Sequence, residues 1–126
     1  MTVLLRLAAL VSFAWATLLL GLKEYVIAAD QLSPLARSFA NGLGLANLVF
    51  TFMFWFAARD AAANRGVIYG AILLSALRTA NDLHGLLVLL PPDRALIGLA
   101  DLVFSVGLLV GILEALPRTL AGKSQK

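Results

Sequence analysis

Long apolar runs alternate with short polar segments along this chain, and the pattern predicts helices that cross a membrane. An apolar stretch of about 20 residues is long enough to span the hydrocarbon core of a bilayer as an α-helix. Such runs lie at residues 3–22, 34–58, 67–90 and 94–116. Because the segments between them are short, we expect four consecutive helices, each antiparallel to the next.

Local signals at the junctions set the expected ends of these helices. Ser33 can cap the second helix, and Pro34 can take its first position, where a missing N–H is harmless. A polar turn at 59–66 (RDAAANRG) separates the second helix from the third. Pro117 is expected to end the fourth helix, since proline cannot continue the backbone hydrogen bonding. The polar, basic tail at 118–126 is expected to fray.

The composition supports a membrane protein. Of the 126 residues, 61% are hydrophobic and 13% are charged, whereas soluble domains are about half apolar and about a quarter charged. Four spans leave no length for a soluble domain, so we expect residues 1–126 to form a single transmembrane domain. The chain has no cysteine, which excludes disulfides, thiolate metal sites and thiol redox chemistry.

The basic residues indicate orientation. The net charge is +3, but these residues are scattered among apolar runs and form no nucleic-acid-binding stripe. We therefore expect the lipid bilayer, and no nucleic acid, as a partner. Lysine and arginine concentrate in cytoplasmic loops. One side of the predicted spans carries Arg6, Arg59, Arg65, Arg118, Lys123 and Lys126, and the other carries Lys23, Arg37 and Arg94. This asymmetry predicts an up-down-up-down bundle with both termini cytoplasmic. As the location we expect the cytoplasmic membrane of a bacterium.

Helical spacing places the polar residues of the third and fourth spans on defined faces. In the third span, Ala71, Ser75, Arg78 and Asp82 follow the alternating spacing of four and three residues that is typical of a packing seam. The adjacent stripe carries Leu74, Leu77, Asn81 and His84. In the fourth span a similar seam consists of Asp101, Ser105, Leu108 and Ile112. Both seams are expected to face the interior of the bundle.

Charged groups within these spans need partners. A charge exposed to hydrocarbon costs at least about 2.5 kcal/mol, so such groups must face protein, water or a ligand. We expect one buried polar cluster that consists of Arg78, Asn81, Asp82, His84, Asp101, Asn41 and Asn47. Three interpretations stay open for it: hydrogen bonds that hold the helices together, a functional pocket or proton path, and contact with another subunit or a pigment-bearing partner.

The single histidine, His84, is considered separately. Histidine can bind a metal ion, haem or the magnesium of a chlorin, but metal sites normally need further ligands, and b-type haem commonly has two axial ligands. A histidine hydrogen-bonded to Asp82, to Asp101 or to lipid headgroups is the favoured interpretation. The sequence therefore predicts no metal site and leaves any cofactor unidentified.

The chain resembles the small four-helix membrane proteins grouped as DoxX-like. The residues that carry this resemblance are Arg37 with Asn41-Gly42-x-Gly44, then Arg59-Asp60 and Arg65, then the buried Arg78. The resemblance covers most of the chain and implies a fold more than an activity. A small multidrug transporter is disfavoured because its first-helix glutamate has no counterpart here. A fluoride channel is disfavoured because the Thr/Ser-Phe-rich motif of its third helix is absent from 67–90.

Three functions follow as hypotheses. The leading one is a non-enzymatic integral membrane protein that acts as an accessory subunit of a larger complex, or that binds a lipophilic ligand through the polar cluster. The alternative is a small transporter or proton- or ion-conducting protein that uses Asp82, Asp101 and Arg78 and works as an oligomer. The third is a lipid- or quinone-directed enzyme in which His84 works with a carboxylate. No catalytic nucleophile or cofactor motif accompanies these residues.

Overall fold

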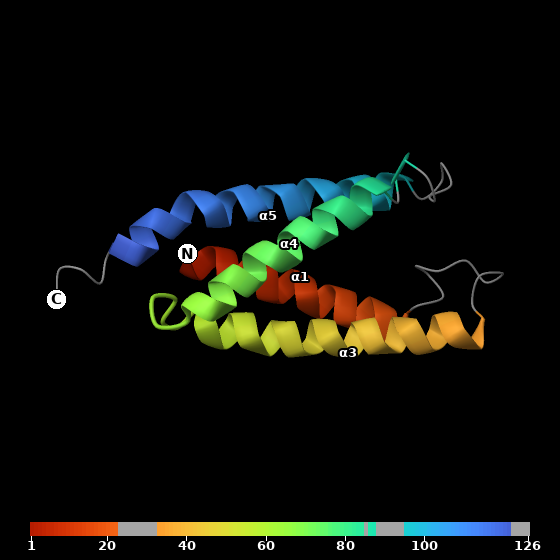
Figure 1. Ribbon diagram of the computed structural model, residues 1–126. Coiled ribbons are helices and arrows are strands. Elements are labelled where there is room, and N and C mark those ends of the chain that lie inside the picture. Colours follow the sequence, from red (N-terminus) through yellow and green to blue (C-terminus); the bar gives the residue numbers. More distant parts are fainter. Residues whose placement is uncertain (23–32, 85, 88–94, 122–126) are drawn as a thin grey trace.

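The computed structural model is all-helical over the residues it describes, which are 1–22, 33–84, 86–87 and 95–121. Its helices are α1 (Thr2–Gly21), α3 (Pro34–Ala57), α4 (Arg65–His84) and α5 (Ala95–Ala121). Consecutive helices run in opposite directions, and α1 starts at the end of the molecule where α5 finishes (Figure 1). The predicted all-α architecture with four helices is confirmed.

Three of these helices are long and apolar enough to cross a membrane: α1, α3 and the segment Gly98–Ala121 of α5. Within the described residues α4 is not among them, because its second half is polar. The span expected at 67–90 includes residues 85 and 88–90, which lie outside the described residues. Passage of α4 through a membrane therefore stays a prediction.

The junctions follow the local signals. The Ser33 hydroxyl accepts a hydrogen bond from the backbone N–H of Ala36 at 3.1 Å, so serine caps α3 as predicted. After α3, the Asp60 carboxylate accepts a hydrogen bond from the backbone N–H of Ala63 at 3.0 Å, which closes the polar turn. Helix α4 then begins at Arg65, slightly earlier than the predicted start of that span.

The predicted end of the fourth helix at Pro117 is wrong. Helix α5 continues through Pro117 to Ala121, so residues 118–121 are helical, and 122–126 lie outside the described residues. Proline removes one backbone hydrogen bond, but neighbouring groups of a membrane helix can compensate for that loss. Just beyond the proline, the Thr119 hydroxyl donates to the carbonyl oxygen of Ala115 at 2.9 Å, which adds a hydrogen bond to this last stretch.

The helices form two hairpins, α1 with α3 and α4 with α5. Close packing within the first hairpin depends on Gly44, since a Cβ atom added there would lie 2.7 Å from the Cγ atom of Leu20. The two hairpins meet near the 58–64 turn, where a small core includes the buried side chains of Leu5, Phe54, Ile68 and Ile112. Toward the other end, α4 inclines away from α3 (Figure 1). This divergence positions the candidate site.

Candidate functional site between the two hairpins

Both predicted seams face the interior. On α4, Ala71 and Ser75 are buried and Arg78 and Asp82 are half-buried, whereas Leu77 is exposed. On α5, Ser105 and Ile112 are buried and Asp101 and Leu108 are half-buried. Each seam therefore passes from small or apolar residues in the core to charged residues where the hairpins separate.

Arg78 joins α4 to α3 through Asn47. One of its guanidinium nitrogens donates a hydrogen bond to Oδ1 of Asn47. The amide nitrogen of Asn47 donates to the carbonyl oxygen of Leu43 in its own helix at 2.9 Å. This intrahelical bond orients the amide so that its acceptor atom faces the arginine.

Each carboxylate of the site accepts a hydrogen bond from α1 or α5. The indole Nε1–H of Trp15, on α1, donates to Oδ1 of Asp101 at 2.9 Å. The hydroxyl of Ser105, on α5, donates to Oδ2 of Asp82 at 3.3 Å. Because an ionised carboxylate can accept about four hydrogen bonds, each aspartate retains capacity to accept further donors.

Among the described residues, the positive and negative charges of the site are unequal in number. Arg78 interacts electrostatically with Asp101 and with Asp82, and the two carboxylates interact with each other. The trio thus has one positive and two negative formal charges. In surroundings of low dielectric constant such an excess is unfavourable, so the site favours an additional proton, cation or hydrogen-bond donor.

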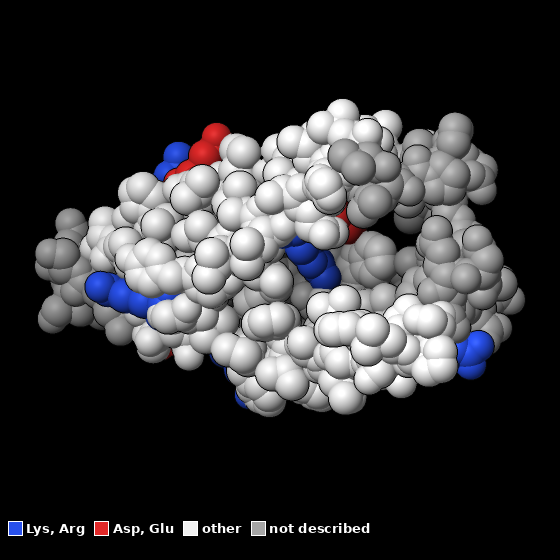
Figure 2. All heavy atoms as spheres, turned by 45° about the vertical axis from the view of Figure 1, so that its right-hand side comes forward, with Lys and Arg blue, Asp and Glu red and all other residues white. Residues whose placement is uncertain are grey.

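The surface of the molecule is hollowed on one face (Figure 2). Figure 2 shows this hollow in one face of the molecule, with one basic and one acidic side chain at its edge. Most of the described atoms around it belong to residues that are neither acidic nor basic (Figure 2). We call Trp15, Asn47, Arg78, Asp82, Asp101 and Ser105 the inter-hairpin cluster, because their hydrogen bonds connect the four helices.

Three residues expected in the buried cluster are exposed. His84 and Asn81 are exposed on α4, and His84 lies about 160° around the helix axis from Asp82 at 3.6 residues per turn. Asn41 is exposed on α3, about 9 Å along the axis from Asn47 at 1.5 Å per residue. The structure therefore brings together Arg78, Asp82, Asp101 and Asn47, whereas Asn41, Asn81 and His84 are exposed.

The arrangement of the described residues also bears on catalysis and metal binding. His84 is directed away from Asp82, so these two groups do not form the acid–base pair of the enzyme hypothesis. Over the described part of the chain, no group of three or more His, Cys, Asp or Glu side chains is arranged to hold a metal ion. The chemistry that the cluster offers is hydrogen bonding and charge pairing.

Sequence reasoning missed Trp15 and gave Ser105 no role beyond packing. A signal for Trp15 was present. An indole N–H within an apolar span needs an acceptor, and few acceptors are available in the neighbouring helices. Helical spacing places Ser105 on the inner seam, but the sequence does not show how close its hydroxyl lies to Asp82.

Comparison with known proteins gives no family assignment. The chain matches no protein-family model, and it shows no significant similarity to a curated protein or to a solved structure. The inter-hairpin cluster is therefore the basis on which we infer the function.

Proposed function

We propose that this chain is an integral membrane protein that binds a lipophilic molecule with a positively charged or hydrogen-bond-donating head group. All four helices would cross the membrane, with both termini in the cytoplasm of a bacterium. The DoxX-like resemblance agrees with such a bundle and stays part of the proposal. The observation that supports binding is the excess of one carboxylate among the described charges of the half-buried cluster.

The charge balance favours a donor head group over an acceptor. The donors of the cluster have described partners within the protein: Trp15 donates to Asp101, Ser105 donates to Asp82, and one of the five N–H groups of Arg78 donates to Asn47. The unused capacity is chiefly that of the carboxylate oxygens, which only accept. An ammonium group would supply both donors and the missing positive charge.

The position of the cluster favours a ligand with an apolar tail. The exposed side chains of the described helices are predominantly apolar, Leu43 on α3 and Leu77 and Leu83 on α4 among them. A head group bound at the cluster would therefore leave its tail against apolar side chains or lipid. A small hydrophilic cation would gain nothing from these surroundings.

A lipophilic amine tests the proposal directly. In Trp55→Phe protein, Trp15 is the one remaining tryptophan, and its indole touches Asp101. We expect dodecylamine to change the emission of Trp15 saturably, and dodecanol, which has the same chain length, to have a much weaker effect. The double variant Asp82→Asn with Asp101→Asn should lose the response to the amine. Glu114→Gln, which alters an exposed carboxylate of α5, should retain it. Equal responses to the two ligands, or an unchanged response in the double variant, would contradict the proposal.

Proton or cation conduction is the second candidate, and the interaction between Asp82 and Asp101 favours it. Conduction needs a continuous path, however, and below the cluster the bundle is closed by Leu5, Ile68 and Ile112, which are 0% exposed. Liposomes that contain the wild-type protein should therefore show no pH-driven or voltage-driven flux above that of empty liposomes. Flux that disappears in the folded double variant would replace ligand binding by conduction.

A further inference from the structure

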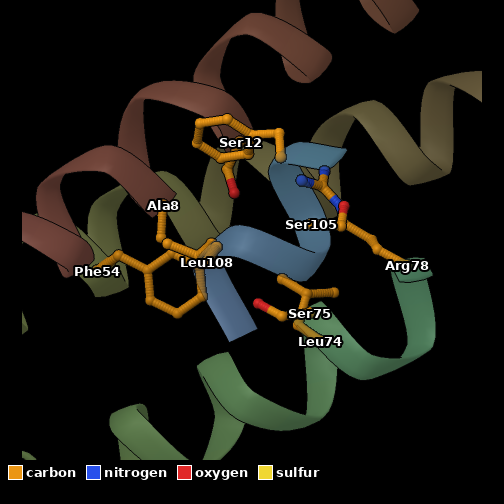
Figure 3. A pocket seen from close by; sticks show the side chains of 9 residues that line it. Ala8, Ser12, Phe54, Leu74, Ser75, Arg78, Ser105 and Leu108 are labelled. Carbon is orange, nitrogen blue, oxygen red and sulfur yellow. The ribbon is translucent and has the colours of Figure 1, made fainter. Parts of the chain in front are cut away.

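Three serines, one from each of three helices, surround a small cavity below the inter-hairpin cluster. Ser12 of α1 is 0% exposed, and Ser75 of α4 and Ser105 of α5 are each 3% exposed. Arg78, Phe54 and Leu108 also line this cavity. In Figure 3 the serines approach the cavity from α1, α4 and α5. Buried hydroxyl groups need hydrogen-bond partners, so three serines around one cavity favour a polar molecule inside it.

The hydroxyl of Ser12 has no hydrogen-bond partner among the described residues. Buried polar side-chain atoms nearly always have one, and serine can satisfy itself through the carbonyl oxygen of a preceding turn. Thr17 does so in the same helix, since its hydroxyl donates to the carbonyl oxygen of Phe13 at 3.0 Å. The orientation of the Ser12 hydroxyl away from such a bond indicates a ligand in the cavity.

Size and charge decide which ligand fits. The cavity measures about 10 Å³, which is close to the space that one water molecule requires. A cation would be repelled by Arg78, which lines the cavity. An anion would add a negative charge to a group in which two carboxylates, Asp82 and Asp101, already outnumber Arg78. A neutral molecule with two donors and two acceptors satisfies the serine hydroxyls without added charge.

We propose that one ordered water molecule occupies this cavity, bound by the hydroxyls of Ser12, Ser75 and Ser105. This water joins α1 of the first hairpin to α4 and α5 of the second. Because Ser105 also donates to Asp82, the water extends the polar network from the carboxylates into the core. The inference is independent of any ligand in the hollow.

Radiolytic hydroxyl-radical labelling with mass spectrometry tests the proposal. Radicals formed from a bound water oxidise the residues beside it, even where bulk solvent does not reach. Phe54 lines the cavity and is 3% exposed, so we expect it to be oxidised in the wild-type protein. The double variant Ser12→Ala with Ser75→Ala should reduce this oxidation several-fold. Oxidation of half-buried Phe50, which does not line the described cavity, should stay unchanged in the same sample.

Thermal unfolding of the Ser12→Ala and Ser75→Ala variants provides a second test. If both serines bind one water, either alanine variant should lower the melting temperature, and the double variant should fall by less than the two single decreases together. A wild-type protein without oxidation at Phe54, or equal oxidation in the double variant, would overturn the proposal. A higher melting temperature for Ser12→Ala would also overturn it, since that result means that the hydroxyl is buried without a partner.

Discussion

Replacing Arg78 by leucine tests whether the cluster is held together by charge. The substitution removes the positive charge that, among the described residues, interacts with the two carboxylates, and it leaves Oδ1 of Asn47 without its donor. Loss of one partner from a fully buried ion pair costs about 3–5 kcal/mol, and an exposed pair contributes only about 0–1 kcal/mol. Since Arg78, Asp82 and Asp101 are half-buried, we expect a loss of about 2 kcal/mol.

The loss should appear in the thermal unfolding of purified protein in detergent, followed by tryptophan emission. For a chain of this size, about 2 kcal/mol corresponds to a decrease of roughly 5–10 °C in melting temperature. Arg37→Leu is a matched control, because it makes the same chemical change at an exposed position of α3. Its melting temperature should stay within about 2 °C of the wild type, as surface substitutions change stability by about 0.5 kcal/mol or less.

A second substitution identifies the cause. Adding Asp101→Asn to Arg78→Leu restores the original excess of one negative charge. The melting temperature of this double variant should therefore be higher than that of Arg78→Leu alone, because the effects of interacting residues are not additive. Asp101 is chosen because it interacts with Arg78 from another helix, α5. A melting temperature for Arg78→Leu equal to that of Arg37→Leu would refute the reasoning, since Arg78 would then be solvated and the cluster would not depend on its charge.

Two further predictions concern packing and topology. Gly44→Ala should lower the free energy of unfolding by about 1–3 kcal/mol, because the new Cβ atom would lie 2.7 Å from the Cγ atom of Leu20. Gly42→Ala, on the same helix, is the control, since a Cβ atom there meets nothing within 4 Å. In the same melting assay this variant should be neutral or stabilising. For topology, a cysteine at Ala63 in the turn after α3 should resist an impermeant thiol reagent in intact cells, and one at Asp30, outside the described residues, should react; the reverse labelling would invert the proposed orientation.

Helical periodicity made most of the interior predictable. The seam through Ser75, Arg78 and Asp82 follows from the spacing of residues within one helix, and the structure confirms that this face is the packed one. The same holds for Asp101 and Ser105 on α5. Such arguments need no knowledge of the neighbouring helices, because the helical repeat alone decides which residues share a face.

The composition of the cluster could not be obtained in this way. Whether Asn41 or Asn47 reaches Arg78 depends on the inclination of α4 relative to α3, and periodicity contains no information on that angle. Trp15 meets Asp101 across 86 positions of sequence, a contact that depends on the arrangement of both hairpins. Pro117 shows the opposite case, in which a local rule predicts a helix end and the helix nevertheless continues to Ala121.

The cluster connects the hairpins in a way that favours coupling between ligand binding and their separation. At the end near the 58–64 turn, the hairpins share an apolar core around Ile68 and Ile112, which is costly to separate. At the level of the cluster they are joined by single hydrogen bonds, Trp15 to Asp101 and Arg78 to Asn47, and such bonds between membrane helices contribute only about 0.6 kcal/mol on average. A donor head group that binds Asp101 competes with one of these bonds and leaves the core intact. If the proposed ligand binds, the hairpins can therefore separate at the level of the cluster while the apolar end stays closed, and Trp15 is the residue whose environment must change.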